Sequence, residues 1–272
     1  MATATPCLFA AAADCLATAD PVQKCAKTRA YAAAFAAGAL APSADAAPPV
    51  PIRFPGRPDR PALVHPKQLP KRGLGSASGR AAFLHAIAHI ELNAVDLAWD
   101  AVYRFRDFPE GYAADFVATA DDEARHFGLL AARLAELGHA YGDFDAHSGL
   151  WEMAEKTAHS ALARMALVPR VLEARGLDVT PGLIERLRFV DDVDSIAVLE
   201  VILREEVAHV AAGTRWFRWC CEREGLAPWP TFAGLVRAHA NRAVRGPFNL
   251  AARRAAGFAD DELEGLAALA AD

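Results

Sequence analysis

Residues 121–130, DDEARHFGLL, place a glutamate and a histidine three positions apart inside a stretch with helical periodicity. The chain repeats this arrangement in residues 204–213, REEVAHVAAG. Side chains at positions i and i+3 of an α-helix leave from neighbouring turns of one face. Each pair can therefore direct a carboxylate oxygen and an imidazole nitrogen to one point. The two pairs are Glu123 with His126 and Glu206 with His209.

A single glutamate precedes each pair at almost the same interval. Glu91 lies 32 residues before Glu123, and Glu173 lies 33 residues before Glu206. Small and apolar residues surround Glu91 on its own helix face, where a carboxylate is costly unless it is paired or bound to a metal. The repeated order, Glu and then Glu-x-x-His, is the ligand set of dinuclear iron and manganese sites in four-helix bundles. We therefore predict one dinuclear metal site with the ligands Glu91, Glu123, His126, Glu173, Glu206 and His209.

Two features of this site stay open at the level of sequence. Glu173 stands only three residues before GLDVTP (176–181), so Glu155, on the same helix face, is the alternative ligand. Asp122 and Glu205 each stand directly before a motif glutamate. Metal-bound histidines usually donate their second N–H to a carboxylate. We predict this role for Asp122 and Glu205, and the alternative is that both are solvated helix residues.

Helical periodicity governs the chain from residue 79 onward, and runs of alternating β-branched residues are absent. We therefore predict an all-α chain in which four long helices form an antiparallel bundle. Their expected ranges are about 79–105, 110–137, 150–175 and 192–223, with an interruption at 176–181, a short helical piece at 182–189 and a turn near 189–192.

Two further segments flank this bundle. Residues 1–78 begin with an Ala-rich helical stretch, and residues 42–70 hold nine of the 17 prolines. That density excludes helix and central strand, so we predict an extended arm docked on the protein. The predicted domains are the N-terminal helix and Pro-rich arm (1–78), the bundle with the metal site (79–224) and a helical tail that packs on the bundle (225–272).

The composition excludes several classes of protein. The net charge of −5 argues against general nucleic-acid binding. No apolar run reaches the about 18 residues that a membrane span needs, and the N-terminal stretch lacks the basic segment of a secretory signal. The five cysteines form no Cys-x-x-Cys pair and suit a reducing compartment. We predict a cytoplasmic protein without a membrane partner and without general nucleic-acid binding.

His85 and His89 are one turn apart on the first long helix. On a helical wheel both point away from the face of Glu91. We predict that they lie at the surface or at an interface, where they favour a homodimer.

Several stretches resemble known families. Residues 79–224 resemble the ferritin-like di-iron carboxylate superfamily, and residues 122–126 (DEARH) are similar to the D-E-x-R-H motif of bacterial multicomponent monooxygenases. The EAR stretches at 123–125 and 173–175 resemble the di-iron tRNA hydroxylase that acts on a modified isopentenyl-adenosine. GRAAFLHAIAHIELNA, MALVPRVLEARGLDVTPG and GTRWFRW resemble a bacterial family catalogued as a domain of unknown function. The resemblance implies a ferritin-like bundle with a dinuclear centre, and it does not supply a substrate.

The expected function follows from this site. We expect an enzyme with two Fe ions, or Mn as the alternative metal, that uses O2 as cosubstrate to hydroxylate or oxygenate a small molecule or modified nucleoside. Electrons would come from an external donor or reductase, and no catalytic residue is predicted apart from the ligands. The alternatives are a ferroxidase or iron-storage protein, a manganese catalase, and a non-catalytic scaffold.

Overall fold

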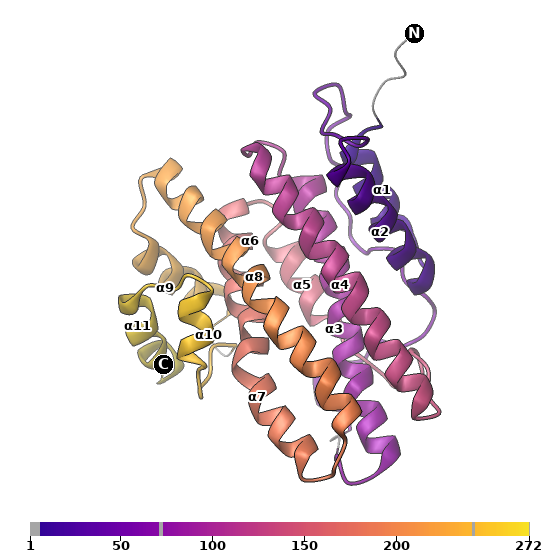
Figure 1. The fold of residues 1–272 in the computed structure, drawn as a ribbon. Helices are drawn as coiled ribbons and strands as arrows, with labels where there is room; N and C mark the ends of the chain where they lie inside the picture. The colour runs from indigo at the N-terminus through magenta and orange to yellow at the C-terminus, as the bar shows by residue number, and fades with distance from the viewer. Residues whose placement is uncertain (1–5, 71–72, 241–242, 272) are drawn as a thin grey trace. The chain divides into compact units, whose positions relative to one another are not determined.

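Helices provide all the regular secondary structure among residues 6–70, 73–240 and 243–271, which a computed structural model describes (Figure 1). Within these ranges, β-pairing is limited to two isolated bridges, Cys7 with Ala41 and Leu63 with Ala146. The predicted all-α class is confirmed. The chain divides into two compact units, Met1–Trp151 and Glu152–Asp272, which are described in turn. The domain boundaries at 78/79 and 224/225 stay predictions.

The first unit is built around a hairpin of two long helices. Ser76 caps the first of them by accepting a hydrogen bond from the Gly79 N–H at 3.1 Å, and the break at residues 105–109 ends with Pro109. Two shorter helices pack along the hairpin (Figure 1). The predicted long helices at 79–105 and 110–137 are confirmed. The elements of this unit are α1 (Leu8–Ala17), α2 (Pro21–Ala36), η1 (Pro66–Gln68), α3 (Ala77–Arg104) and α4 (Glu110–Glu136).

The Pro-rich arm runs in extended form and docks within this unit, as predicted. Its Gly56 N–H donates to the Leu16 carbonyl at 2.6 Å, and a Cβ at this position would collide with the backbone of α1. The Gly56 carbonyl accepts a hydrogen bond from Lys24 Nζ at 2.9 Å. Lys24 also forms a buried ion pair with Asp96 of α3. One lysine therefore ties the arm to α2 and α3.

The second unit contains another long antiparallel pair. One member is an interrupted helix made of α6, η2 and α7, and the other is α8. A turn at residues 189–192 connects them. In residues 225–240 and 243–271, the described part of the tail, the chain forms three short helices. The elements are α6 (Ala161–Leu167), the π-helical turn η2 (Val168–Glu173), α7 (Ala174–Arg188), α8 (Val193–Glu224), α9 (Pro228–His239), α10 (Leu250–Ala255) and α11 (Asp260–Ala271). A further helix, α5 (Gly149–Lys156), spans the sequence boundary between the units.

The prediction of a third long helix over residues 150–175 was wrong about the position of the break. The break falls after α5, and Ser160 caps α6 by accepting a hydrogen bond from the Ala163 N–H at 3.1 Å. Residues 176–181, predicted to interrupt the helix, belong to α7. Pro181 has no N–H to donate to the Leu177 carbonyl, but Asn249 Nδ2 lies 3.2 Å from that oxygen and takes its place. A tertiary contact thus compensates for the local helix breaker.

No helix in the described ranges combines the length and the apolar character needed to cross a membrane.

Candidate metal centre

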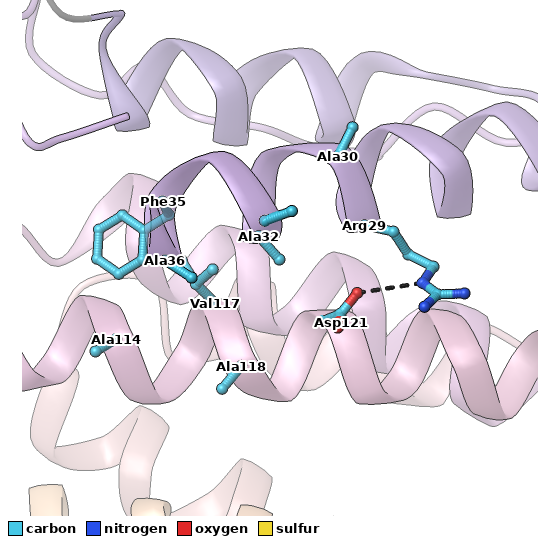
Figure 2. Close-up of a pocket in the computed structure, with 10 residues that line it drawn as sticks. Arg29, Ala30, Ala32, Phe35, Ala36, Ala114, Val117, Ala118 and Asp121 are labelled. Atoms are coloured by element: carbon cyan, nitrogen blue, oxygen red, sulfur yellow. Dashed lines mark ion pairs between the residues drawn. The ribbon is translucent and has the colours of Figure 1, made fainter. Parts of the chain in front are cut away.

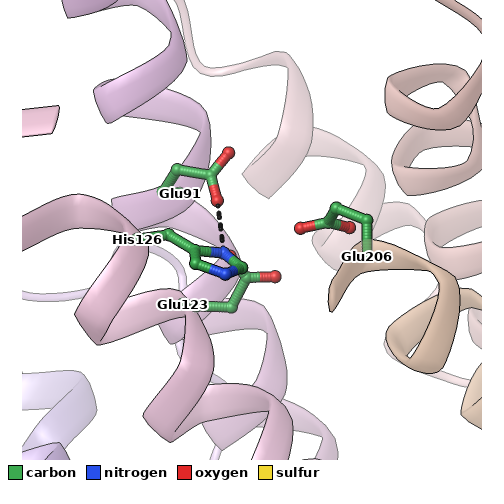
Figure 3. Close-up of side chains that lie close together, drawn as sticks. All are labelled: Glu91, Glu123, His126 and Glu206. Atoms are coloured by element: carbon green, nitrogen blue, oxygen red, sulfur yellow. Dashed lines mark hydrogen bonds and ion pairs between the residues drawn. The ribbon is translucent and has the colours of Figure 1, made fainter. Parts of the chain in front are cut away.

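Three of the predicted ligands converge in the first unit. Glu91 of α3 and Glu123 and His126 of α4 are 4%, 1% and 0% exposed. His126 Nδ1 lies 3.1 Å from Glu91 Oε2 and 3.5 Å from Glu123 Oε2. One ligand atom from each residue lies within 4.8 Å of the others. Figure 3 shows the three side chains turned toward one another, and it also draws Glu206, which belongs to the second unit.

The hairpin geometry explains why these residues meet. Glu91 stands 13 residues before the end of α3 at Arg104, and Glu123 stands 13 residues after the start of α4 at Glu110. Residues equally far from the turn of an antiparallel pair lie at the same level. His126 follows Glu123 by three residues and therefore shares its face.

The cluster is electrostatically coupled. Burial lowers the pKa of His126, but hydrogen bonds to the Glu123 and Glu91 carboxylates outweigh that effect and raise its pKa to about 10. In the absence of metal, a proton on His126 therefore partly offsets the two buried carboxylates. Two carboxylates and one imidazole form a donor set that suits iron or manganese. This buried Glu/His cluster can bind a metal ion.

The second unit holds the other Glu-x-x-His pair. Glu206 and His209 are both buried on α8, and His209 Nδ1 lies 3.4 Å from Glu206 Oε1. Glu173 is half-buried and ends the π-helical turn η2. Among the described residues, these three do not bring one ligand atom each within 4.8 Å of one another. Their role as ligands stays a prediction.

The remaining candidates differ in their surroundings. The alternative ligand Glu155 is exposed on α5, unlike the buried glutamates above. Asp122 Oδ1 accepts a hydrogen bond from Arg125 Nη2 at 2.8 Å, and Glu205 Oε1 lies 3.2 Å from Arg204 Nη2. Their predicted hydrogen bonds to ligating histidines stay a prediction.

His85 and His89 are not surface residues, and this prediction was wrong. Both are buried because the segment after α4 folds back over α3. His85 Nε2 accepts a hydrogen bond from the Gly142 N–H at 2.9 Å, and its ring stacks on Tyr141. His89 Nδ1 lies 2.8 Å from the Tyr141 hydroxyl. The helix face that they share therefore gives no support to a homodimer. The contacts of Tyr141 with both histidines were not predicted from the sequence.

The first unit also has an open groove of about 720 Å³ between α2 and α4 (Figure 2). The Arg29 Nε to Asp121 Oδ1 ion pair, 3.5 Å long, closes one end of it. None of the predicted ligands lines this groove. Most of its wall is alanine, contributed by Ala30, Ala32, Ala33, Ala36, Ala114 and Ala118.

Comparisons with known proteins identify a family and one curated relative. The family described as "Protein of unknown function (DUF455)" matches residues 17–264. A protein of Haemophilus influenzae described as "Uncharacterized protein" is 45% identical over 214 residues, which cover 76% of this chain and 74% of that protein. No solved structure matches the chain. The resemblance to a family of unknown function is thereby confirmed, whereas membership of the ferritin-like superfamily stays a prediction. The chain belongs to the DUF455 family.

Proposed function

We propose that this protein is a di-iron carboxylate oxidoreductase that uses O2 to hydroxylate or oxygenate a small molecule or a modified nucleoside. The observation that carries the proposal is the buried cluster of Glu91, Glu123 and His126. The predicted ligands Glu173, Glu206 and His209 belong to the same proposal. A ferritin-like bundle belongs to the same proposal, because this order of ligands holds two metal ions in that fold.

The residues of the cluster fit a metal better than they fit a purely structural role. Two buried carboxylates leave one negative charge uncompensated even when His126 is protonated, and a bound metal cation would offset it. The neighbouring α3 side chains Ala88 and Val95 are fully buried and apolar. A non-catalytic scaffold would have no use for this arrangement.

The chemistry divides between the metal and the chain. When bound, a reduced di-iron pair supplies the activation of O2. The chain supplies carboxylate and imidazole ligands, and its apolar surroundings exclude water from them. His126 Nδ1 lies between Glu91 and Glu123, and these carboxylates favour the protonated imidazole when no metal is bound. Electrons come from an external donor or reductase, since the sequence has no Fe–S or flavin motif.

The first test is metal content per chain, measured by inductively coupled plasma mass spectrometry on protein purified without chelator. We expect about two iron atoms per chain. Glu123→Ala and His209→Ala should each lose tight binding of at least one ion and stay helical by circular dichroism. Glu136→Ala is the matched control, because Glu136 and His139 form a third Glu-x-x-His match at the end of α4, where Glu136 is exposed.

Unchanged metal content in both ligand variants would refute the ligand assignment. Manganese as the main metal would redirect the search to peroxide disproportionation. Protein that binds no metal after reconstitution with Fe(II) would support the scaffold instead. If iron is bound, O2 consumption in the presence of a chemical reductant is the next measurement.

A further inference from the structure

A fully buried arginine lies in the π-helical turn that ends at Glu173. Arg170 is 0% exposed, and its Nη2 donates a hydrogen bond to Glu262 Oε1 of α11 at 2.6 Å. Glu262 is itself buried, and its other oxygen accepts from the Ala259 N–H at 2.9 Å. Removing two charges from water is expensive, so a buried ion pair is weak evidence for stability alone. The pair calls for another explanation.

Three aromatic rings enclose the same guanidinium. Its Cζ lies 4.5 Å from the ring centroid of Phe217, 4.4 Å from that of Phe232 and 4.5 Å from that of Phe258. Within the described part of the chain, the buried Nε and Nη1 atoms have no hydrogen-bond partner, so ring faces provide the remaining stabilisation of the cation. Through these contacts Arg170 joins η2 to α8, α9 and α11.

The turn is also held against α8. Pro169 lacks an N–H and interrupts the regular helical hydrogen bonds at this point. Gly213 of α8 faces the proline ring, and a Cβ there would collide with Pro169 Cβ and Cγ. Gly213 lies one turn after His209. The π-helical turn is thus fixed on one side by α8 and on another by the C-terminal tail.

We infer that Arg170 is a positioning residue for the metal ligand Glu173, an inference that rests on the proposed metal centre. A π-helical turn accommodates one residue more than an α-helical turn. Relaxation of η2 to regular α-helix would rotate the helix on one side of it by about 100° relative to the other. Glu173 ends the turn, so its direction depends on the contacts that keep the turn in place. The cage of Phe217, Phe232 and Phe258 and the partner Glu262 provide those contacts through Arg170.

The experiment uses Co(II) as the probe, because its visible absorption reports coordination geometry. Anaerobic Co(II) titrations are carried out on the full-length protein and on Arg170→Met. We expect Arg170→Met to stay helical by circular dichroism, to bind one of the two Co(II) ions at least about tenfold more weakly, and to show a changed visible spectrum. Loss of packing alone would not change the spectrum of the bound metal.

Arg253→Met is the matched control. Arg253 is also buried, donates from Nη2 to Asp178 Oδ2 at 2.7 Å and lies over Phe258, but it pins α10 to α7 and does not belong to η2. We expect it to lose thermal stability while it keeps the wild-type Co(II) affinity and spectrum. Equal losses of Co(II) affinity in both variants would overturn the inference, because they would show general loosening.

Wild-type affinity and spectrum in Arg170→Met would also overturn it. If Arg170→Met does not fold, Glu262→Gln compared with Asp178→Asn makes the same test, since these variants remove the countercharges and keep the shapes. A wild-type protein that binds no Co(II) would overturn the proposed metal centre itself. The two failures are therefore distinguishable.

Discussion

Gly213 shows how a single residue decides the course of a helix. It is the point at which α8 approaches Pro169, and the space that a Cβ would need is already filled by the proline ring. The sequence contains many glycines, and only the tertiary contact marks this one as essential. Gly128, inside α4, is the opposite case, since among the residues that the structure describes no atom beyond its own helix backbone and chain neighbours lies within 4 Å of the position that a Cβ would take there.

Gly213→Ala should lower the free energy of unfolding by about 1–3 kcal/mol, because overpacking forces the helix and the proline apart. Gly128→Ala should raise it by up to about 1 kcal/mol, because alanine has the higher helix propensity and meets no neighbour. Urea denaturation followed by circular dichroism measures both. A Gly213→Ala protein as stable as the wild type would contradict the close approach.

Among the elements, α7 depends on a group outside itself. The Leu177 carbonyl loses its helical donor at Pro181 and is bonded by Asn249 Nδ2 instead. Asn249 also caps α10 by accepting from the Ala252 N–H at 3.1 Å. These contacts explain why GLDVTP is helical although its local propensity predicts a break.

Asn249→Ala should destabilise the protein by about 1–3 kcal/mol, through a lost cap and a buried carbonyl left without its donor. In a Pro181→Ala background the same substitution should cost less, because residue 181 then has an N–H for Leu177. A double-mutant cycle from urea denaturation midpoints measures the difference. Equal costs in both backgrounds would mean that Asn249 does not compensate for Pro181.

Across the whole molecule, buried ion pairs join segments far apart in the sequence. Lys24 pairs with Asp96 in the first unit, and in the second unit Glu262 pairs with Arg170 and Arg253 with Asp178. In each pair one partner belongs to a shorter flanking helix and the other to the principal helix pair of its unit. Flanking segments are thus attached by charge as well as by apolar packing.

The contribution of the Glu262 carboxylate, on α11, to the stability of the protein should depend on pH. Burial raises the pKa of Glu262, but Arg170 and the hydrogen bond from Ala259 outweigh burial and hold it below its usual 4.5. A lowered carboxyl pKa contributes stability above pH 4.5, and this stability is lost as the pH falls through the folded-state value. Thermal unfolding measured between pH 6 and about pH 3 should therefore show a loss in the wild type that is smaller in Glu262→Gln.

Glu264→Gln, which changes an exposed glutamate on the same helix, should follow the wild-type pH curve. If Glu262→Gln loses stability with falling pH as steeply as the wild type, the carboxylate of Glu262 is not the group responsible.

Three of the four long helices and half of the candidate site were predictable because they depend on local rules. Helical periodicity located α3, α4 and α8 to within a few residues, and a helical turn places His126 beside Glu123 in any context. The short break between α3 and α4 then brings Glu91 to the same level. The spacing of such residues along the chain is sufficient to predict that they lie close together, because two residues equally far from the turn of a helical hairpin lie at the same level.

The tertiary structure alone decided that His85, His89 and Arg170 are buried. The sequence pattern predicts His85 and His89 at the surface, but the segment that carries Tyr141 covers them. Arg170 has no distinguishing feature in the sequence, but Glu262 and three phenylalanines surround it in the structure. The helical course of residues 176–181 likewise depends on Asn249. The burial of these side chains depends on segments distant in the sequence, so the local pattern around them does not indicate it.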